Sequence, residues 1–84
     1  MYKIHYRKSA AKTLTRMPMK TAQQFMSAFE QLALDHNEQL DIKKLQNRDG
    51  YRLRIGGYRA LYRIIAEVLV IEVVAIGSRG DIYK

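Results

Sequence analysis

Four arginines lie close together in the middle of the chain. Arg52 and Arg54 precede a Gly56-Gly57 pair, and Arg59 and Arg63 follow it. Guanidinium groups stay charged at neutral pH and bind phosphate oxygens through paired hydrogen bonds. A cluster of them can hold a phosphodiester and stabilise the negative charge that develops when that bond is cleaved.

The residues around the glycine pair predict a β-hairpin. Apolar and basic residues alternate before and after it, which is the period of a β-strand. A two-residue turn at Gly56-Gly57 would place Arg54 directly opposite Arg59, with Arg52 and Arg63 on the same face. Because like charges in opposite positions destabilise a hairpin, we expect an anion to bind over this pair. The alternative is that the arginines only keep an exposed sheet face soluble.

Composition narrows the classes of function. With 84 residues we expect one domain over 1–84, and the net charge of +7 indicates a nucleic-acid or acidic protein partner. The chain has no cysteine, which excludes a thiol nucleophile and a thiolate metal site. It has no apolar run of membrane-spanning length and no signal-peptide pattern, so we expect a cytoplasmic protein with no membrane partner.

Segments before the hairpin predict the elements that support it. Residues 2–6 alternate and predict an opening strand. Ser9 is a suitable N-cap for a first helix over 10–16. Apolar residues recur at three- and four-residue steps from Ala22 to Ala33, which predicts a second helix that ends near His36-Asn37.

The remaining segments complete the predicted sheet. Residues 42–45 are compatible with either a short strand or a turn. The apolar run over 68–76 predicts a strand in the sheet interior, largely covered on both sides. The expected fold is therefore α+β: an N-terminal strand, a helical hairpin and a three-stranded antiparallel meander in one sheet, with the helices on one face.

In this order the segments resemble the RelE/ParE superfamily of bacterial toxins. The resemblance rests on residues 50–54 and 57–64 of the hairpin, on Lys44-Leu45, and on Ile76-Gly77-Ser78-Arg79 followed by Asp81-Ile82-Tyr83. RelE-like members cut messenger RNA in the ribosomal A site, whereas ParE-like members inhibit DNA gyrase. The resemblance thus implies a toxin of a type II toxin–antitoxin system.

Basic residues on the hairpin, an arginine after the last strand and a tyrosine near the end favour the RelE-like branch. In this chain they are Arg52, Arg54, Arg59, Arg79 and Tyr83. The best-known RelE pattern has lysines where this chain has Arg52 and Arg54. A ParE-like gyrase inhibitor and a non-catalytic nucleic-acid-binding module are the alternatives.

The resemblance also implies roles for individual residues. RNA can be cut when its 2′-hydroxyl attacks the adjacent phosphate, and we expect Arg54, Arg59 and Arg79 to hold that phosphate. Tyr83 would move a proton, with its pKa lowered by the arginines, or would stack on a base. The expected contacts to the rest of the RNA come from Lys43, Lys44, Arg52 and Arg63. No carboxylate cluster indicates a metal site, and no cofactor is expected.

Partners follow from the same resemblance. We expect a cognate RelB-like antitoxin, acidic or amphipathic, that neutralises the toxin in a hetero-oligomeric complex. The other expected partners are the A site of the small ribosomal subunit and the messenger RNA bound there.

Overall fold

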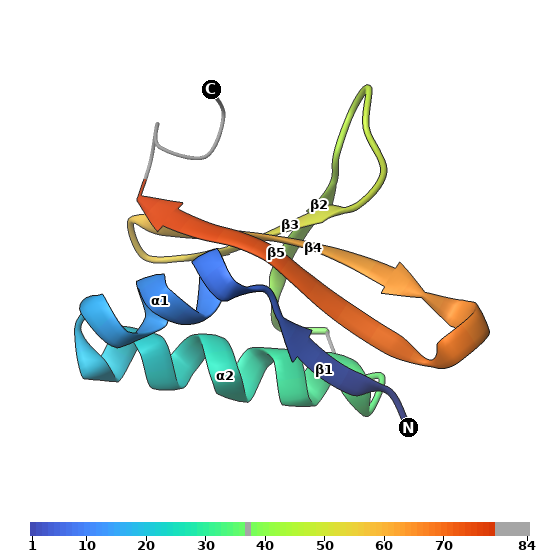
Figure 1. Ribbon diagram of the computed structural model, residues 1–84, viewed down its shortest axis with the longest axis horizontal. Helices are drawn as coiled ribbons and strands as arrows, with labels where there is room; N and C mark the ends of the chain where they lie inside the picture. The colour runs from blue at the N-terminus through green and yellow to red at the C-terminus, as the bar shows by residue number, and fades with distance from the viewer. Residues whose placement is uncertain (37, 79–84) are drawn as a thin grey trace.

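Two helices pack on one face of a five-stranded sheet in the computed structural model, which describes residues 1–36 and 38–78 (Figure 1). The strand order is β1-β5-β4-β3-β2; β1 is parallel to β5 and the other neighbours are antiparallel. The elements are β1 (Lys3–Tyr6), α1 (Lys8–Arg16), α2 (Met19–Ala33), β2 (Asp41–Lys44), β3 (Tyr51–Ile55), β4 (Tyr58–Ile65), the short 3₁₀ helix η1 (Ala66–Val68) and β5 (Val70–Ser78). The α+β architecture with both helices on one face is therefore confirmed.

The hairpin of β3 and β4 has the predicted register. Arg54 lies opposite Arg59, and Leu53 lies opposite Ala60. Gly56 takes a left-handed φ of 58°, which glycine adopts without the strain that a side chain would cause. The turn therefore determines which side chains of the two strands become neighbours.

Residues 42–45, for which the sequence was compatible with a short strand or a turn, lie largely in a strand, β2. β2 pairs with β3 and places Asp41 opposite Arg54 and Lys43 opposite Arg52. The meander consequently has four strands, and Asp41 belongs to the sheet instead of the preceding loop.

The start of α1 and the end of α2 differ from the sequence prediction. α1 begins at Lys8, so Ser9 is not its N-cap; the Ser9 hydroxyl instead donates to the Val74 carbonyl at 3.4 Å. α2 ends at Ala33 because Asp35 turns left-handed with a φ of 62°. The N–H groups of Asp35 and His36 then donate to carbonyls of the last helical turn, which is a Schellman motif.

The core lies between the helices and the sheet. Phe25 and Phe29 of α2 are fully buried against the sheet residues Leu53 and Val73. Phe29 also meets the Tyr62 ring edge-on, with the ring centroids 5.5 Å apart. This packing covers one side of the strands with apolar side chains.

β5 lies inside the sheet, between β1 and β4, as predicted for the apolar run. Its two faces are not equally covered, however. Ile71 and Val73 are buried on the helix side, whereas Glu72 and Val74 on the other side are half-buried. The prediction of cover on both sides was therefore too strong. None of the helices in the described ranges is both long and apolar enough to span a membrane.

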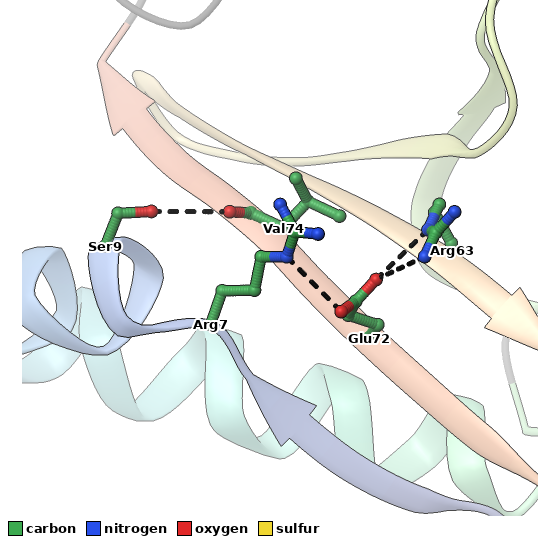
Figure 2. A network of polar contacts seen from close by, with 5 residues as sticks. All are labelled: Arg7, Ser9, Arg63, Glu72 and Val74. Carbon is green, nitrogen blue, oxygen red and sulfur yellow. Dashed lines mark hydrogen bonds and ion pairs between the residues drawn. The ribbon is translucent and has the colours of Figure 1, made fainter.

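An ion-pair network joins three segments on the sheet face away from the helices (Figure 2). Glu72 of β5 accepts hydrogen bonds from Arg63 of β4, at 2.7 Å from Nη2 and 3.1 Å from Nε. Its other oxygen accepts one from Nε of Arg7, between β1 and α1, at 3.3 Å. These two guanidinium groups, chiefly that of Arg63, hold the pKa of the Glu72 carboxyl below its ordinary value of 4.5.

The loop between β2 and β3 is closed tightly against β4. The Leu45 N–H donates to the Gly50 carbonyl at 3.0 Å, and Gly50 has a φ of 123°. A Cβ atom on Gly50 would come within 2.7 Å of the Tyr62 carbonyl oxygen. Glycine is needed at position 50 both for its backbone conformation and for this close approach.

We expect Gly50→Ala to destabilise the fold by about 1–3 kcal/mol, because it adds strain and a clash with the β4 backbone. Urea unfolding of the purified protein measures this change. Gly57→Ala is the matched control: nothing lies within 4 Å of its added Cβ, so its stability should be unchanged or slightly higher. Equal effects of the two substitutions would contradict the role given to Gly50.

We expect Glu72→Gln to destabilise the protein at neutral pH. Because the folded-state pKa of Glu72 is lowered, its contribution is present above the unfolded-state pKa and is lost as the pH falls through the folded value. The difference in unfolding free energy between wild type and variant should therefore shrink from about pH 7 to about pH 3. Glu67→Gln, at an exposed position, is the control with the same charge change. A difference that does not vary with pH would refute the ion-pair explanation.

Candidate nucleic-acid interface

The sheet face opposite the helices is strongly basic. Side chains alternate along each strand, and Ile4, Ile42 and Leu53 face the core. The charged residues on the other face are Lys3, Arg7, Lys43, Arg52, Arg54, Arg59 and Arg63, together with Asp41 and Glu72. With seven basic and two acidic side chains, this basic face carries a net charge of +5.

At the turn of the β3–β4 hairpin, the Arg54–Arg59 pair borders a shallow pocket of about 230 Å³, which also includes Gly56 and Gly57. The two glycines leave the space above the turn open. The Arg54 side chain is 43% exposed, so its guanidinium group is within reach of a ligand. This hairpin pocket can therefore receive an anion such as a phosphate group.

A carboxylate from the neighbouring strand partly offsets the repulsion between the arginines. The Asp41 side chain lies 3.7 Å from Nη2 of Arg52 and 4.0 Å from Nε of Arg54. Sequence reasoning missed this contact because Asp41 precedes the segment 42–45 in which a short strand was considered, whereas β2 begins at Asp41 itself. A long, exposed ion pair such as that between Asp41 and Arg54 contributes about 1 kcal/mol or less, so a bound phosphate could compete with Asp41 for Arg54.

Arg52 is much less accessible than Arg54. Its side chain is 14% exposed, and its Nε atom is buried without a hydrogen-bond partner in the described part of the chain. A buried unpaired donor costs free energy, and packing and the contact with Asp41 hold Arg52 in place despite this cost. Because Nε is buried, its terminal nitrogens are the atoms left to contact an anion.

The remaining predicted residues lie in different places. Lys43 and Arg63 are on the basic face, although Arg63 is paired with Glu72. Lys44 lies opposite Tyr51 and therefore on the helix side of the sheet. Arg79 and Tyr83 lie outside the described residues.

Two tyrosines of the described region are unsuited to proton transfer at neutral pH. Tyr6 and Tyr62 pack against the core. Burial raises the pKa of Tyr6 to about 12 and raises that of Tyr62 further. Neither phenol would readily become phenolate, and both point away from the arginines.

Sequence reasoning also missed Arg7 as part of the basic face. The alternation that places Tyr2, Ile4 and Tyr6 toward the core continues one residue further, so it could have placed Arg7 on the opposite side. Its contact with Glu72 could not have been found in this way, because it depends on the parallel pairing of β1 with β5.

Comparison with known proteins gives consistent results. Residues 4–83 match the family model described as the ParE toxin of the type II toxin–antitoxin system parDE. An Escherichia coli protein described as RelE-like toxin is 32% identical over 88 residues, covering 99% of this chain and 90% of that protein.

Solved structures share the fold. The RelE–RelB complex from Pyrococcus horikoshii matches with a TM-score of 0.77 and 27% identity, over 95% of this chain and 97% of that one. The isolated Escherichia coli RelE toxin matches with a TM-score of 0.78 and 22% identity, over 99% and 92% of the two chains. On this evidence the chain belongs to the RelE/ParE family of toxins of type II toxin–antitoxin systems.

Proposed function

We propose that this toxin is an endoribonuclease that cuts messenger RNA in the A site of the ribosome and so inhibits translation. The observation that carries this proposal is the Arg54–Arg59 pair at the end of the basic face. Two guanidinium groups beside an open pocket match the charge and geometry of a phosphodiester.

The reaction begins when the 2′-hydroxyl of the RNA attacks the adjacent phosphorus. The bond to the 5′-oxygen of the next nucleotide breaks, which leaves a 2′,3′-cyclic phosphate and a 5′-hydroxyl. Arg54 and Arg59 hold the nonbridging oxygens, whose negative charge increases in the transition state. The chain's own residues thus provide charge stabilisation without a bound metal ion.

Proton transfer is assigned to residues outside the described region. Tyr83 takes the proton of the 2′-hydroxyl, and Arg79 donates a hydrogen bond to the leaving 5′-oxygen, which takes up its proton from water as the bond breaks. Neighbouring guanidinium groups favour the phenolate form of a tyrosine. His5 is a poor candidate, because it lies opposite Glu72 in β1 at the far edge of the sheet from β3.

The ribosome is the proposed source of the correct RNA geometry. In-line attack requires a particular conformation of the sugar and phosphate, and correct orientation accounts for a large part of many rate enhancements. The hairpin pocket is shallow and open, so it does not enclose a nucleotide by itself. We therefore expect little cleavage of free RNA.

The proposed neutralising partner is a RelB-like antitoxin in a cytoplasmic hetero-oligomer. Structural relatives include complexes of RelE with RelB. On α2 and just after it, Met19, Met26 and Leu34 are exposed, which gives an amphipathic partner apolar surface to cover. An acidic antitoxin would also complement the basic face.

A gyrase inhibitor is the second candidate, since the matching family model is that of the ParE toxin. The endoribonuclease and the gyrase inhibitor predict opposite results in assays of message cleavage and DNA supercoiling. A gyrase inhibitor would stop DNA supercoiling by purified gyrase and leave messages intact. A binding module without catalysis would do neither.

We expect Arg54→Ala and Arg59→Ala each to slow message cleavage on programmed ribosomes by about 10²–10³-fold, because each removes a donor to the transition-state phosphate. Single-turnover cleavage rates measure the effect. Lys20→Ala on α2 removes the same charge from the helix side and should keep the wild-type rate. Rates near wild type in both arginine variants would exclude the proposed site.

We expect Tyr83→Phe to slow cleavage by about 10²–10⁴-fold, because it removes the proton-transferring hydroxyl and keeps the ring. The same ribosome assay, run over a range of pH, measures this change. If Tyr83→Phe is fully active and Tyr83→Ala is not, the tyrosine acts by stacking. Full activity in both variants would remove Tyr83 from the mechanism.

A further inference from the structure

A second pocket lies on the basic face, away from the hairpin turn. It has a volume of about 190 Å³, and three arginines line it: Arg7, Arg48 and Arg63. Leu61 and Val74 of the sheet are also among its lining residues, and Asp49 is its acidic residue. We call it the distal pocket. Arg63 is among the residues expected to contact RNA, whereas Arg7 and Arg48 have no role assigned above.

Glu72 holds two of these arginines in place. It accepts from Nε and Nη2 of Arg63 and from Nε of Arg7, as Figure 2 shows. An arginine has five N–H donors, so each guanidinium group retains donors that these bonds do not use. Glu72 therefore fixes the two arginines and leaves part of each available to a ligand.

The tight loop between β2 and β3 supplies the third arginine. This loop stands on the side of the sheet opposite the helices (Figure 1). Its closure by Leu45 and Gly50 sets Arg48 and Asp49 beside Arg63. Arg48 is exposed and has no hydrogen bond or ion pair with any residue in the described ranges. Its charge is therefore not used to hold the fold together.

The size and charge of the pocket favour a phosphate group. Three arginines and one aspartate give its lining a net charge of +2, which becomes +1 when Glu72, paired with Arg7 and Arg63, is included. Its volume of about 190 Å³ corresponds to about six water molecules at roughly 30 Å³ each, which is enough for a phosphate but small for a whole nucleotide. Leu61 is only 3% exposed, so little apolar surface is available for stacking a base.

We propose that the distal pocket binds a second RNA phosphodiester, and this inference rests on the proposed function. Arg63 follows Arg59 by four residues on β4, which corresponds to about 13 Å along a strand. A phosphate in the distal pocket would therefore not be the scissile one. It would come from another nucleotide of the message or from ribosomal RNA beside it, and it would contribute to binding rather than to the chemical step.

The test measures binding of the full-length toxin to ribosomes programmed with an uncleavable message, in which deoxynucleotides occupy the A-site codon. We expect Arg48→Ala to weaken binding by about tenfold, the size of one charge-assisted hydrogen bond. The slope of log affinity against log salt should become shallower by about 0.7, the value for one phosphate contact on single-stranded nucleic acid. Lys20→Ala should change neither quantity beyond the effect of net charge.

Arg63→Gln is the second variant. It removes the charge of Arg63, but glutamine can still donate to Glu72, so the fold should be retained. Thermal unfolding checks that both variants fold. Arg63→Gln, like Arg48→Ala, should weaken binding to the programmed ribosomes. Messages that end at the A-site codon identify the source of the phosphate. If shortening the message abolishes the Arg48 effect, the phosphate belongs to the message downstream of the A-site codon; if the effect persists, it belongs to the retained part of the message or to ribosomal RNA. Either result supports the proposal that the distal pocket binds a phosphate.

Binding by folded Arg48→Ala and Arg63→Gln that equals that of Lys20→Ala would overturn the inference. In that case Arg54→Ala and Arg59→Ala would still slow cleavage, and the proposed function would stand. A wild-type toxin that neither binds programmed ribosomes nor cuts their message would overturn both.

Discussion

The packing of α2 against the sheet determines which way every strand residue faces. Phe29 meets Tyr6 and Tyr62 edge-on, and Leu53, Ile71 and Val73 fill the space around it. Side chains in a strand alternate, so a slip of one residue would move all the arginines of a strand into this core. The burial of aromatic rings on one side is thus what gathers guanidinium groups on the other.

On the basic face, two carboxylates of the toxin itself partly neutralise the arginines. Asp41 contacts two arginines of β3, and Glu72 of β5 contacts Arg63 of β4 and Arg7, which follows β1. The Arg63–Glu72 contact is short, at 2.7 Å, and partly buried, whereas the Arg54–Asp41 contact is long, at 4.0 Å, and exposed. The face therefore has a firmly held region around Arg63 and a loosely held one around Arg54, where the phosphate to be cleaved is proposed to bind.

Local sequence signals predicted local structure well. The glycine pair gave the hairpin register, and the spacing of Phe25 and Phe29 gave the buried side of α2. The missed features all depend on contacts between distant segments. Asp41 reaches Arg54 only because β2 joins the sheet, and Arg7 reaches Glu72 across 65 residues of sequence. Patterns within one segment contain no information on such pairings. Arg79 and Tyr83 lie outside the described residues, so their predicted roles stay predictions.

The position of β5 has a consequence for how the toxin is made. It is the last of the described strands along the chain, yet it separates β1 from β4 in the sheet. During synthesis β1 has no strand to pair with until β5 emerges, and contacts between such distant segments form slowly. A nascent chain that ends before β5 lacks the strand that joins β1 to the rest of the sheet. The toxin can therefore complete its folded sheet only after β5 has been synthesised.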